Sequence, residues 1–316
     1  LINRFLNLRP SNLKNYIMKT LVLFTLSFTL LICTTYAQPF NKEVTIEGKN
    51  PVLLGKVNKE ILTTKTYADW FLKNYEDYEP ESTDIKIINQ KLPEYSITAF
   101  FGSWCGDSKK QLPPFYKILD EAKFPLERLT VVGVSREHDD YKQSPGGEEE
   151  GLNIHRVPTF IFYKDGIEIN RIVEQPIATL EHDMSMLLQN ENYIPNFNSV
   201  TIVNDALKKM GTGKFNRKAK KLLPELRKEA KSLSELNTYS SVLFFSDRKE
   251  EALTVAKLNT LLFPNEAYTY ENLANKLFQT NSLEEALENY ETSLTLDPKN
   301  ERVKKSISTT KEKIGV

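Results

Sequence analysis

A four-residue motif near the C-terminal end of the chain returns after 34 residues. The motif Glu-Glu-Ala-Leu occupies positions 250–253 and again 284–287, and Pro264 recurs as Pro298 at the same interval. A period of this length is typical of proteins built from stacked helical pairs, in which each pair buries its apolar face only against its neighbours. The repeat therefore restricts this part of the chain to an all-helical array.

The spacing resembles that of tetratricopeptide (TPR) repeats, with one copy at about 233–266 and a second at about 267–300. The second copy keeps the residues typical of the family, namely Tyr270, Leu273, Ala274, Leu277, Ala286, Tyr290 and Pro298. Both copies also depart from it, because Ser240 and Ser293 stand at small-residue positions. The resemblance implies either a structural or dimerisation unit or a peptide-binding groove.

Two copies are few for a stable stack, which usually needs about three repeats. We therefore expect helices at about 200–210 and 215–230 to complete the stack, with 299–313 as a polar cap.

The sequence upstream of the repeats alternates short apolar runs with helical stretches. The apolar runs predict strands at 96–101, 129–134, 159–163 and 167–173, and helical spacing predicts helices at 66–75, 108–122 and 177–188. An Asp165-Gly166 turn joins the last two strands as a hairpin. This order predicts an α/β domain with a mixed sheet over residues 38–190. A polar linker at 191–199 and a helical domain at 200–316 would follow.

The first 37 residues have the features of an export signal. Lys19 precedes the uncharged apolar run 21–32, and residues 35–37 offer a cleavage site that ends at Ala37. Met18 makes a better start than Leu1, so residues 1–17 are expected to lie upstream of the true start. Cleavage would give a periplasmic or secreted protein with no stable membrane insertion. The alternative is an uncleaved anchor.

Charge and cysteine content exclude several classes of protein. The chain has 42 Lys and Arg and 42 Asp and Glu, and residues 38–316 keep 38 of the former against 42 of the latter. This balance gives no general basic field, so we predict no nucleic-acid partner. Two cysteines exclude a disulfide-rich scaffold and a four-cysteine zinc site, and His138 and His182 lack ligand spacing. We assign no metal.

A local exception is the segment 208–231, which has ten basic residues and two acidic ones. We interpret it as a solvated helix face, with an acidic partner or a membrane surface as the alternatives.

After cleavage Cys105 would be the only cysteine, and it lies between a predicted buried strand and a predicted helix. The first turn of a helix has unpaired N–H groups and the positive end of the helix dipole, both of which favour a thiolate. Lys109 and Lys110 act in the same direction, and Asp107 opposes them. Because the thiolate is the nucleophilic form, Cys105 is the candidate reactive residue.

The segment Trp104-Cys105-Gly106-Asp107-Ser108 resembles the thioredoxin active site, Trp-Cys-Gly-Pro-Cys, and Val157-Pro158-Thr159 resembles the cis-proline loop of that family. The resemblance covers about residues 60–190. It implies that Cys105, Ser108 and Pro158 form the catalytic site. It also implies that client proteins contact Trp104, Gly106, Asp107, Val157 and Thr159.

Two departures from the thioredoxin pattern concern the second half of the reaction. Ser108 replaces the resolving cysteine, although its hydroxyl could donate a hydrogen bond to the Cys105 thiolate, and Ala99 replaces the buried aspartate. The loop between Val134 and Leu152 is longer than in small thioredoxins and is expected to border the site. His155 is expected on the surface of a loop.

The resemblance thus implies an exported thiol–disulfide oxidoreductase of the monothiol (CxxS) type. Cys105 would form a mixed disulfide with a client protein, the TPR-like repeats would recruit a protein partner, and no bound cofactor is required. The alternative is a redox-inactive thioredoxin fold that only binds proteins. A third reading is peroxide sensing through a sulfenic acid at Cys105.

Overall fold

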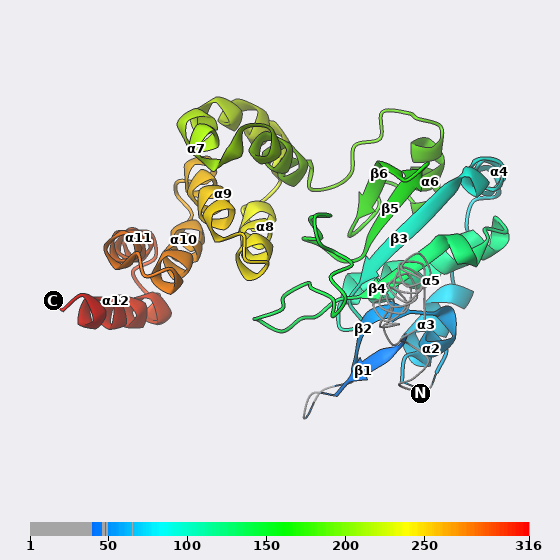
Figure 1. The fold of residues 1–316 in the computed structure, drawn as a ribbon, viewed down its shortest axis with the longest axis horizontal. Helices are drawn as coiled ribbons and strands as arrows, with labels where there is room; N and C mark the ends of the chain where they lie inside the picture. The colour runs from blue at the N-terminus through cyan, green and yellow to red at the C-terminus, as the bar shows by residue number, and fades with distance from the viewer. Residues whose placement is uncertain (1–39, 46–47, 49, 65, 316) are drawn as a thin grey trace, which may run out of the picture. The chain divides into compact units, whose positions relative to one another are not determined.

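Six strands form one mixed sheet in the computed structural model, which describes residues 40–45, 48, 50–64 and 66–315 (Figure 1). The strands are β1 (Lys42–Val44), β2 (Val52–Val57), β3 (Tyr95–Phe101), β4 (Leu129–Gly133), β5 (Thr159–Lys164) and β6 (Ile167–Val173). Their order is β1-β2-β4-β3-β5-β6. Only β3 and β4 pair in parallel; the other neighbours in this sheet are antiparallel. The predicted signal peptide, residues 1–37, lies outside the described residues.

The two central strands, β4 and β3, place buried apolar residues on both faces, because both faces of a central strand are covered. β3 is flanked by β4 and β5, and Ala99 pairs with Val131 on one side and with Phe160 on the other. The turn between β5 and β6 has positive φ at Asp165 (51°) and Gly166 (77°), as the predicted tight hairpin requires.

Gly133 allows β2 and β4 to approach closely. A Cβ atom at this position would lie 2.2 Å from the Leu53 carbonyl oxygen, which is far inside contact distance. A residue larger than glycine would therefore push β2 away from the end of β4.

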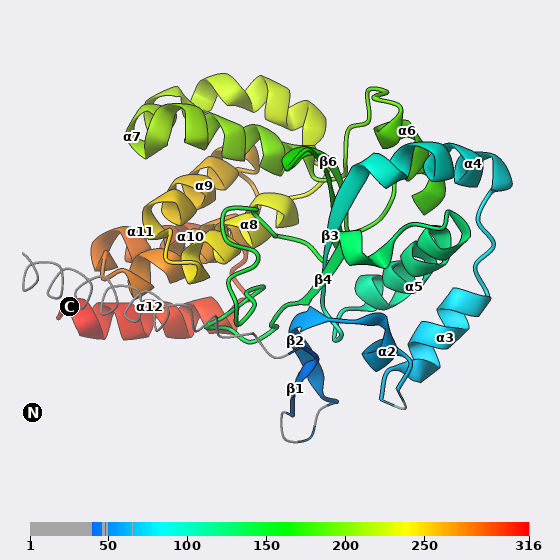
Figure 2. The ribbon, with the colours of Figure 1, turned by 45° about the vertical axis from the view of Figure 1, so that its right-hand side comes forward.

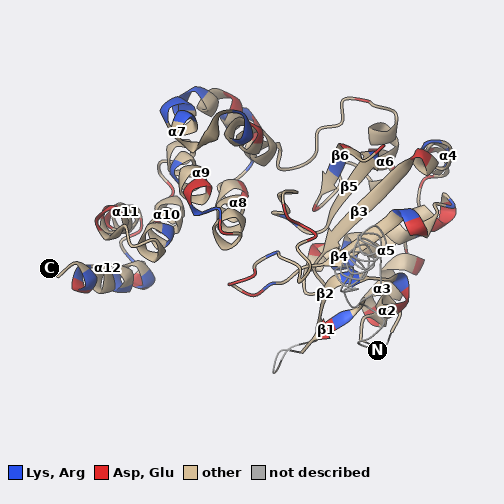
Figure 3. Ribbon diagram, in the orientation of Figure 1, with Lys and Arg blue, Asp and Glu red and all other residues tan. Residues whose placement is uncertain are grey.

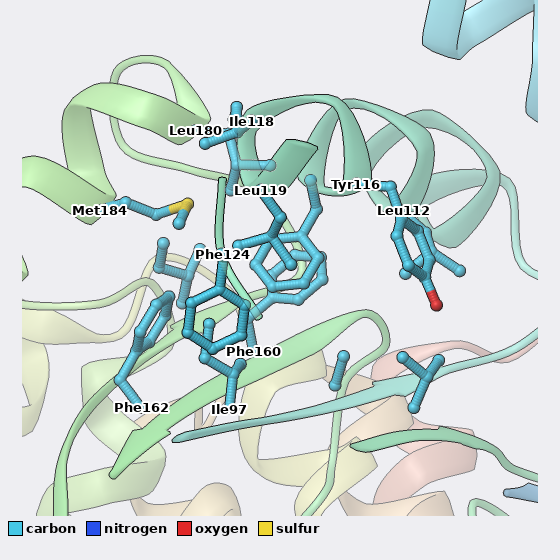
Figure 4. Packing of buried hydrophobic residues seen from close by; sticks show 14 of the residues in the cluster. Ile97, Leu112, Tyr116, Ile118, Leu119, Phe124, Phe160, Phe162, Leu180 and Met184 are labelled. Atoms are coloured by element: carbon cyan, nitrogen blue, oxygen red, sulfur yellow. The ribbon is translucent and has the colours of Figure 1, made fainter. Parts of the chain in front are cut away.

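One face of the sheet is covered by helices. They are α2 (Lys59–Leu62), α3 (Ala68–Glu76), α4 (Ser82–Lys91), α5 (Gly106–Glu121) and α6 (Leu180–Leu188). Their apolar residues join the sheet in one core (Figure 4). Phe115 of α5 stacks on Phe160 of β5 with ring centroids 4.2 Å apart. This contact fixes α5, which begins next to Cys105, against the strand that follows Pro158.

The opposite face of the sheet has a smaller apolar cluster. Phe100, Val132 and Ile161 of the central strands pack with Ile154 and Val157 of the segment before β5. Trp104 and Cys105 border this cluster, so the candidate reactive residue lies at the edge of this second core.

The remainder of the described chain is helical. Its helices are α7 (Asn198–Glu229), α8 (Ser234–Phe245), α9 (Lys249–Leu262), α10 (Ala267–Gln279), α11 (Leu283–Leu296) and α12 (Glu301–Ile314). α7 is broken at Gly211, where φ is 68° and ψ is 164°, and its two parts correspond to the two helices predicted there. From α8 onwards each helix packs against the next (Figure 2). A mixed sheet with flanking helices followed by a helical region agrees with the predicted fold class.

Hydrogen bonds connect the sheet to the helical region. Gln143 Nε2 donates to the Phe245 carbonyl (2.6 Å), and Arg248 Nη1 donates to Asn153 Oδ1 (3.0 Å). The long loop after β4 is therefore held against α8 and the start of α9. Residues 39–316 form one compact unit. None of the helices in the described part is long and apolar enough to cross a bilayer.

Candidate functional site

Cys105 occupies the residue immediately before α5 and is half-buried. Its backbone is extended (φ −89°, ψ 130°), its N–H donates to the Gly102 carbonyl (2.8 Å), and its own carbonyl accepts from Lys109 N (3.1 Å). The thiol thus lies at the N-terminus of a 16-residue helix. The helix dipole there favours negative charge on sulfur.

The loop before β5 reaches the same thiol although it is 52 residues away in the sequence. Cys105 Sγ donates to the Val157 carbonyl oxygen (3.3 Å), and the Val157–Pro158 peptide bond is cis. Thr159 Oγ1 donates to the Arg156 carbonyl (2.8 Å), so the loop is fixed on both sides of Pro158. The structure therefore brings together Cys105, Val157 and Pro158.

Ser108 is buried in the first turn of α5 and contacts the other side of the active-site loop. Its Oγ accepts a hydrogen bond from Gly102 N (3.0 Å). Within the described residues no hydrogen bond joins Ser108 to Cys105. The hydroxyl therefore supports the loop rather than the sulfur.

The predicted client-contact residues differ in how far they are exposed to solvent. Val157 and Thr159 have buried side chains, whereas Gly106 is exposed. Asp107 Oδ1 accepts from Gln175 Nε2 (2.9 Å), which ties the start of α5 to the segment after β6. Trp104 Nε1 donates to the Val134 carbonyl (2.9 Å), so its indole packs under the long loop after β4, which borders the site as expected.

Lys142 was not identified from the sequence, yet it is a buried charged group that interacts electrostatically with Cys105. The side chain is only 5% exposed, and Nζ lies 5.4 Å from the Trp104 ring centroid and 4.9 Å from that of Tyr141. Within the described residues it makes no ion pair. Burial lowers the pKa of Lys142 to about 8, against an opposing charge interaction with Cys105. The buried amine thus contacts Trp104, the residue before Cys105, and interacts electrostatically with the half-buried thiol.

An ion pair flanks the site on the side of α8. Arg156 Nη1 lies 3.3 Å from Glu174 Oε1, and Arg156 Nη2 donates to the Ser234 carbonyl (3.2 Å) and to Thr238 Oγ1 (3.3 Å). Burial raises the pKa of Glu174, and the neighbouring Arg156 charge partly offsets this rise. Arg156, one residue before Val157, thus links the cis-proline loop to the helical region.

The expectation that His155 lies on the surface is wrong. The ring is 5% exposed, its Nδ1 is 3.0 Å from the Asn153 carbonyl, and its edge contacts Phe197 and Tyr239. Burial lowers the pKa of His155 to about 3, so the ring stays neutral. The residues that bury it come from the helical region, and no local sequence signal indicated this contact.

A cavity of about 480 Å³ opens between the long loop and the helical region. Arg136, His138 and Tyr141 line it from the loop; Ser234, Asn237, Thr238, Ser241 and Phe245 line it from α8, and Tyr268 and Asn272 line it from α10. Tyr141, which lines this cavity, interacts electrostatically with Cys105 and with Tyr268. In the described residues, no group of three or more His, Cys, Asp or Glu could hold a metal ion.

Comparison with known proteins points in the same direction as the geometry. No protein-family model matches the chain. Over 102 residues the chain is 29% identical to the thioredoxin Asp f 29 of Aspergillus fumigatus, a match that spans 31% of this chain and 86% of that protein. This similarity and the mixed sheet with flanking helices both fit a thioredoxin-like domain.

Proposed function

We propose that the chain carries out monothiol thiol–disulfide exchange with client proteins through Cys105. The observation that carries this proposal is the half-exposed Cys105 thiol, which lies at the start of α5 and within hydrogen-bond distance of the cis-proline loop. A thiol kept only for packing would have no reason to face solvent at the positive end of a helix.

The exchange has two steps, each of which forms one sulfur–sulfur bond and breaks another. The Cys105 thiolate attacks one sulfur of a client disulfide, and the displaced client sulfur leaves as a thiolate that takes a proton from water. A second thiol, from the client or from a small molecule, then attacks the client sulfur of the mixed disulfide. Cys105 leaves as a thiolate, and the second thiol is oxidised.

The surrounding residues have distinct proposed roles. Val157 and Thr159 would contact the client through their backbone, because their side chains are buried. Gly106 leaves the approach to the sulfur open, and Trp104 and Asp107 support the two sides of the loop through Val134 and Gln175.

The helical region would recruit the partner. We propose that α8 to α11 are two TPR-like repeats, because equivalent helices begin about one repeat length apart. α8 begins at Ser234 and α10 at Ala267, 33 residues later. α9 begins at Lys249 and α11 at Leu283, 34 residues later. The cavity beside α8 and α10 would hold a client segment next to Cys105. We further propose that the protein is exported to an oxidising compartment, because a client disulfide is stable there.

The second candidate function is a protein-binding platform without exchange chemistry. It is favoured by Ser108 and Ala99, which stand where two-cysteine enzymes have the resolving thiol and the buried acid. Because both residues are buried and well packed, the fold does not need the missing groups.

Trapping of mixed disulfides distinguishes the two functions. The full chain should form covalent adducts with disulfide-containing envelope proteins, and these adducts should disappear on reduction. Cys105→Ser should abolish them. In the chain before cleavage, Cys33→Ser is the matched control and should retain them, since there both variants lose one thiol. Equal adduct formation by the Cys105→Ser variant, or none by the wild type, would favour the platform.

The alkylation rate of Cys105 is expected to depend on Lys142. Lys142→Met should slow alkylation at about pH 7 by about three- to tenfold, because a nearby cation favours the thiolate. Lys142→Arg keeps the charge and should retain most of the rate. Since the pKa of Lys142 is lowered to about 8, the wild-type cation is lost above that pH. The difference between wild type and Lys142→Met should therefore shrink as the pH rises through 8 towards 10.

The measurement is the rate of iodoacetamide alkylation between about pH 5 and pH 10, followed by mass spectrometry, with circular dichroism as the check on folding. Superimposable profiles for wild type and a folded Lys142→Met variant would rule out this role for the buried amine.

A further inference from the structure

Ten basic residues lie in α7 and directly after it, and blue marks a large part of the α7 ribbon in Figure 3. They are Lys208, Lys209, Lys214, Arg217, Lys218, Lys220, Lys221, Arg227, Lys228 and Lys231, and every one of them is exposed. We call this set the α7 basic face. The opposite side of the same segment is apolar and buried, through Phe215, Ala219 and Leu226. In the part of α7 after Gly211, the basic residues therefore lie on the side opposite these buried residues.

Ion pairs do not neutralise the charge of these side chains in the part of the chain that the structure describes. No residue of the α7 basic face takes part in an ion pair with any described residue. Lys231 Nζ contacts a neutral group, Asn196 Oδ1 (2.9 Å). The segment 208–231 has ten basic and two acidic residues, whereas the rest of residues 38–316 has 28 basic and 40 acidic residues. The near-neutral total thus hides a strong separation of charge.

The composition of the α7 basic face favours a diffuse anionic surface over a folded partner. Eight of its ten cations are lysines, which are strongly hydrated point charges that do not need fixed geometry. Protein interfaces are depleted of lysine and anchored by aromatic side chains and arginine. None of the large apolar side chains that are exposed in the described chain belongs to residues 208–231. Single-stranded nucleic acid would also need aromatic stacking partners.

We propose that the α7 basic face docks the protein on the anionic headgroups of a lipid bilayer, without insertion of any segment into the hydrocarbon. Each lysine or arginine close to such a surface contributes a factor of about five to binding, so a few simultaneous contacts suffice for a reversible association. The association would hold the thiol site near the membrane. It does not depend on Cys105 chemistry, and it concerns a different surface from the cavity beside α8.

Vesicle co-sedimentation of residues 39–316 tests this proposal, since these residues form one compact unit and lack the apolar N-terminal run. Vesicles with about 30% phosphatidylglycerol in phosphatidylcholine should bind the protein at about 0.05 M salt and release it at about 0.5 M. Pure phosphatidylcholine vesicles should not bind it. The triple variant Lys214→Gln, Lys218→Gln, Lys221→Gln should bind about 100-fold more weakly.

The matched control removes the same three charges elsewhere, as Lys86→Gln, Lys91→Gln, Lys123→Gln, all at exposed positions. It should keep wild-type affinity for the anionic vesicles. An equal loss in both triple variants, or no binding of the wild type at low salt, would overturn the proposal. The proposal would also be overturned if binding of poly-glutamate depended on the α7 basic face and vesicle binding did not. That result would identify an acidic protein as the partner. The alkylation rate of Cys105 should be unchanged in the α7 triple variant, so the two proposals can fail separately.

Discussion

Ser108→Cys is expected to release a client from its mixed disulfide with Cys105 at least about 1000-fold faster than the wild type does in the presence of about 1 mM free thiol. The reason is proximity. Position 108 lies in the first turn of α5, three residues after Cys105, and its side chain is buried against Gly102. A thiol held there attacks as an intramolecular group, with an effective concentration of about 1 M or more.

The stability cost of this change should be small, about 1 kcal/mol, because sulfur replaces one hydroxyl that accepts a single hydrogen bond from Gly102 N. The measurement starts from the adduct of Cys105 with a peptide disulfide and follows peptide release by mass spectrometry, without added thiol for Ser108→Cys and with about 1 mM thiol for the wild type.

Ser103→Cys is the matched control. Ser103 is also buried and its Oγ also accepts from a backbone N–H, that of Leu53 (3.0 Å), but this directs the side chain towards β2. The control adduct should persist as in the wild type. If the Ser108→Cys adduct persisted equally, Ser108 could not stand at the position of a resolving thiol.

Phe160→Ala is expected to lower the free energy of unfolding by about 3–5 kcal/mol. Phe160 is 1% exposed and stacks on Phe115, and it lies among Ile97, Leu119 and Met184 in the core between the sheet and the helices (Figure 4). Removal of the ring would leave a cavity where α5 contacts β5. Because Cys105 precedes α5 and Pro158 precedes β5, the same cavity would loosen the contact between Cys105 and Val157.

Equilibrium denaturation in urea, followed by circular dichroism, gives the size of the loss. Ile167→Ala is the control, since Ile167 is at the tip of the same hairpin and 68% exposed; it should change the free energy of unfolding by less than about 0.5 kcal/mol. A loss at Phe160 as small as that at Ile167 would show that the stacked pair does not hold α5 on the sheet.

Local sequence patterns located several elements of this fold. The apolar run predicted at 96–101 is β3 (Tyr95–Phe101), the helix predicted at 108–122 is α5 (Gly106–Glu121), and the break between two helices near 211 is present at Gly211. The prediction succeeded because apolar periodicity, turn residues and helix ends each depend on a few neighbouring residues.

The strand β2 (Val52–Val57) has no such signal. Gly55, with φ at 75°, interrupts its apolar run and weakens the strand pattern. Pairing with β4, close to Gly133, makes this segment a strand, and that pairing joins residues about 75 positions apart.

For the site, the sequence by itself determined the thiol, its position before a helix, the proline loop and the replacement of a second cysteine by Ser108. Which charged groups surround the thiol depends on the packing of distant segments. Lys142 lies over the Trp104 ring, next to Cys105 in the sequence, because the long loop is held by α8. Contacts with residues 197 and beyond bury His155 and hold the half-buried Arg156. The physical reason is that charge interactions and burial depend on distance in space, and the chain brings these groups together only when the sheet and the helical region pack.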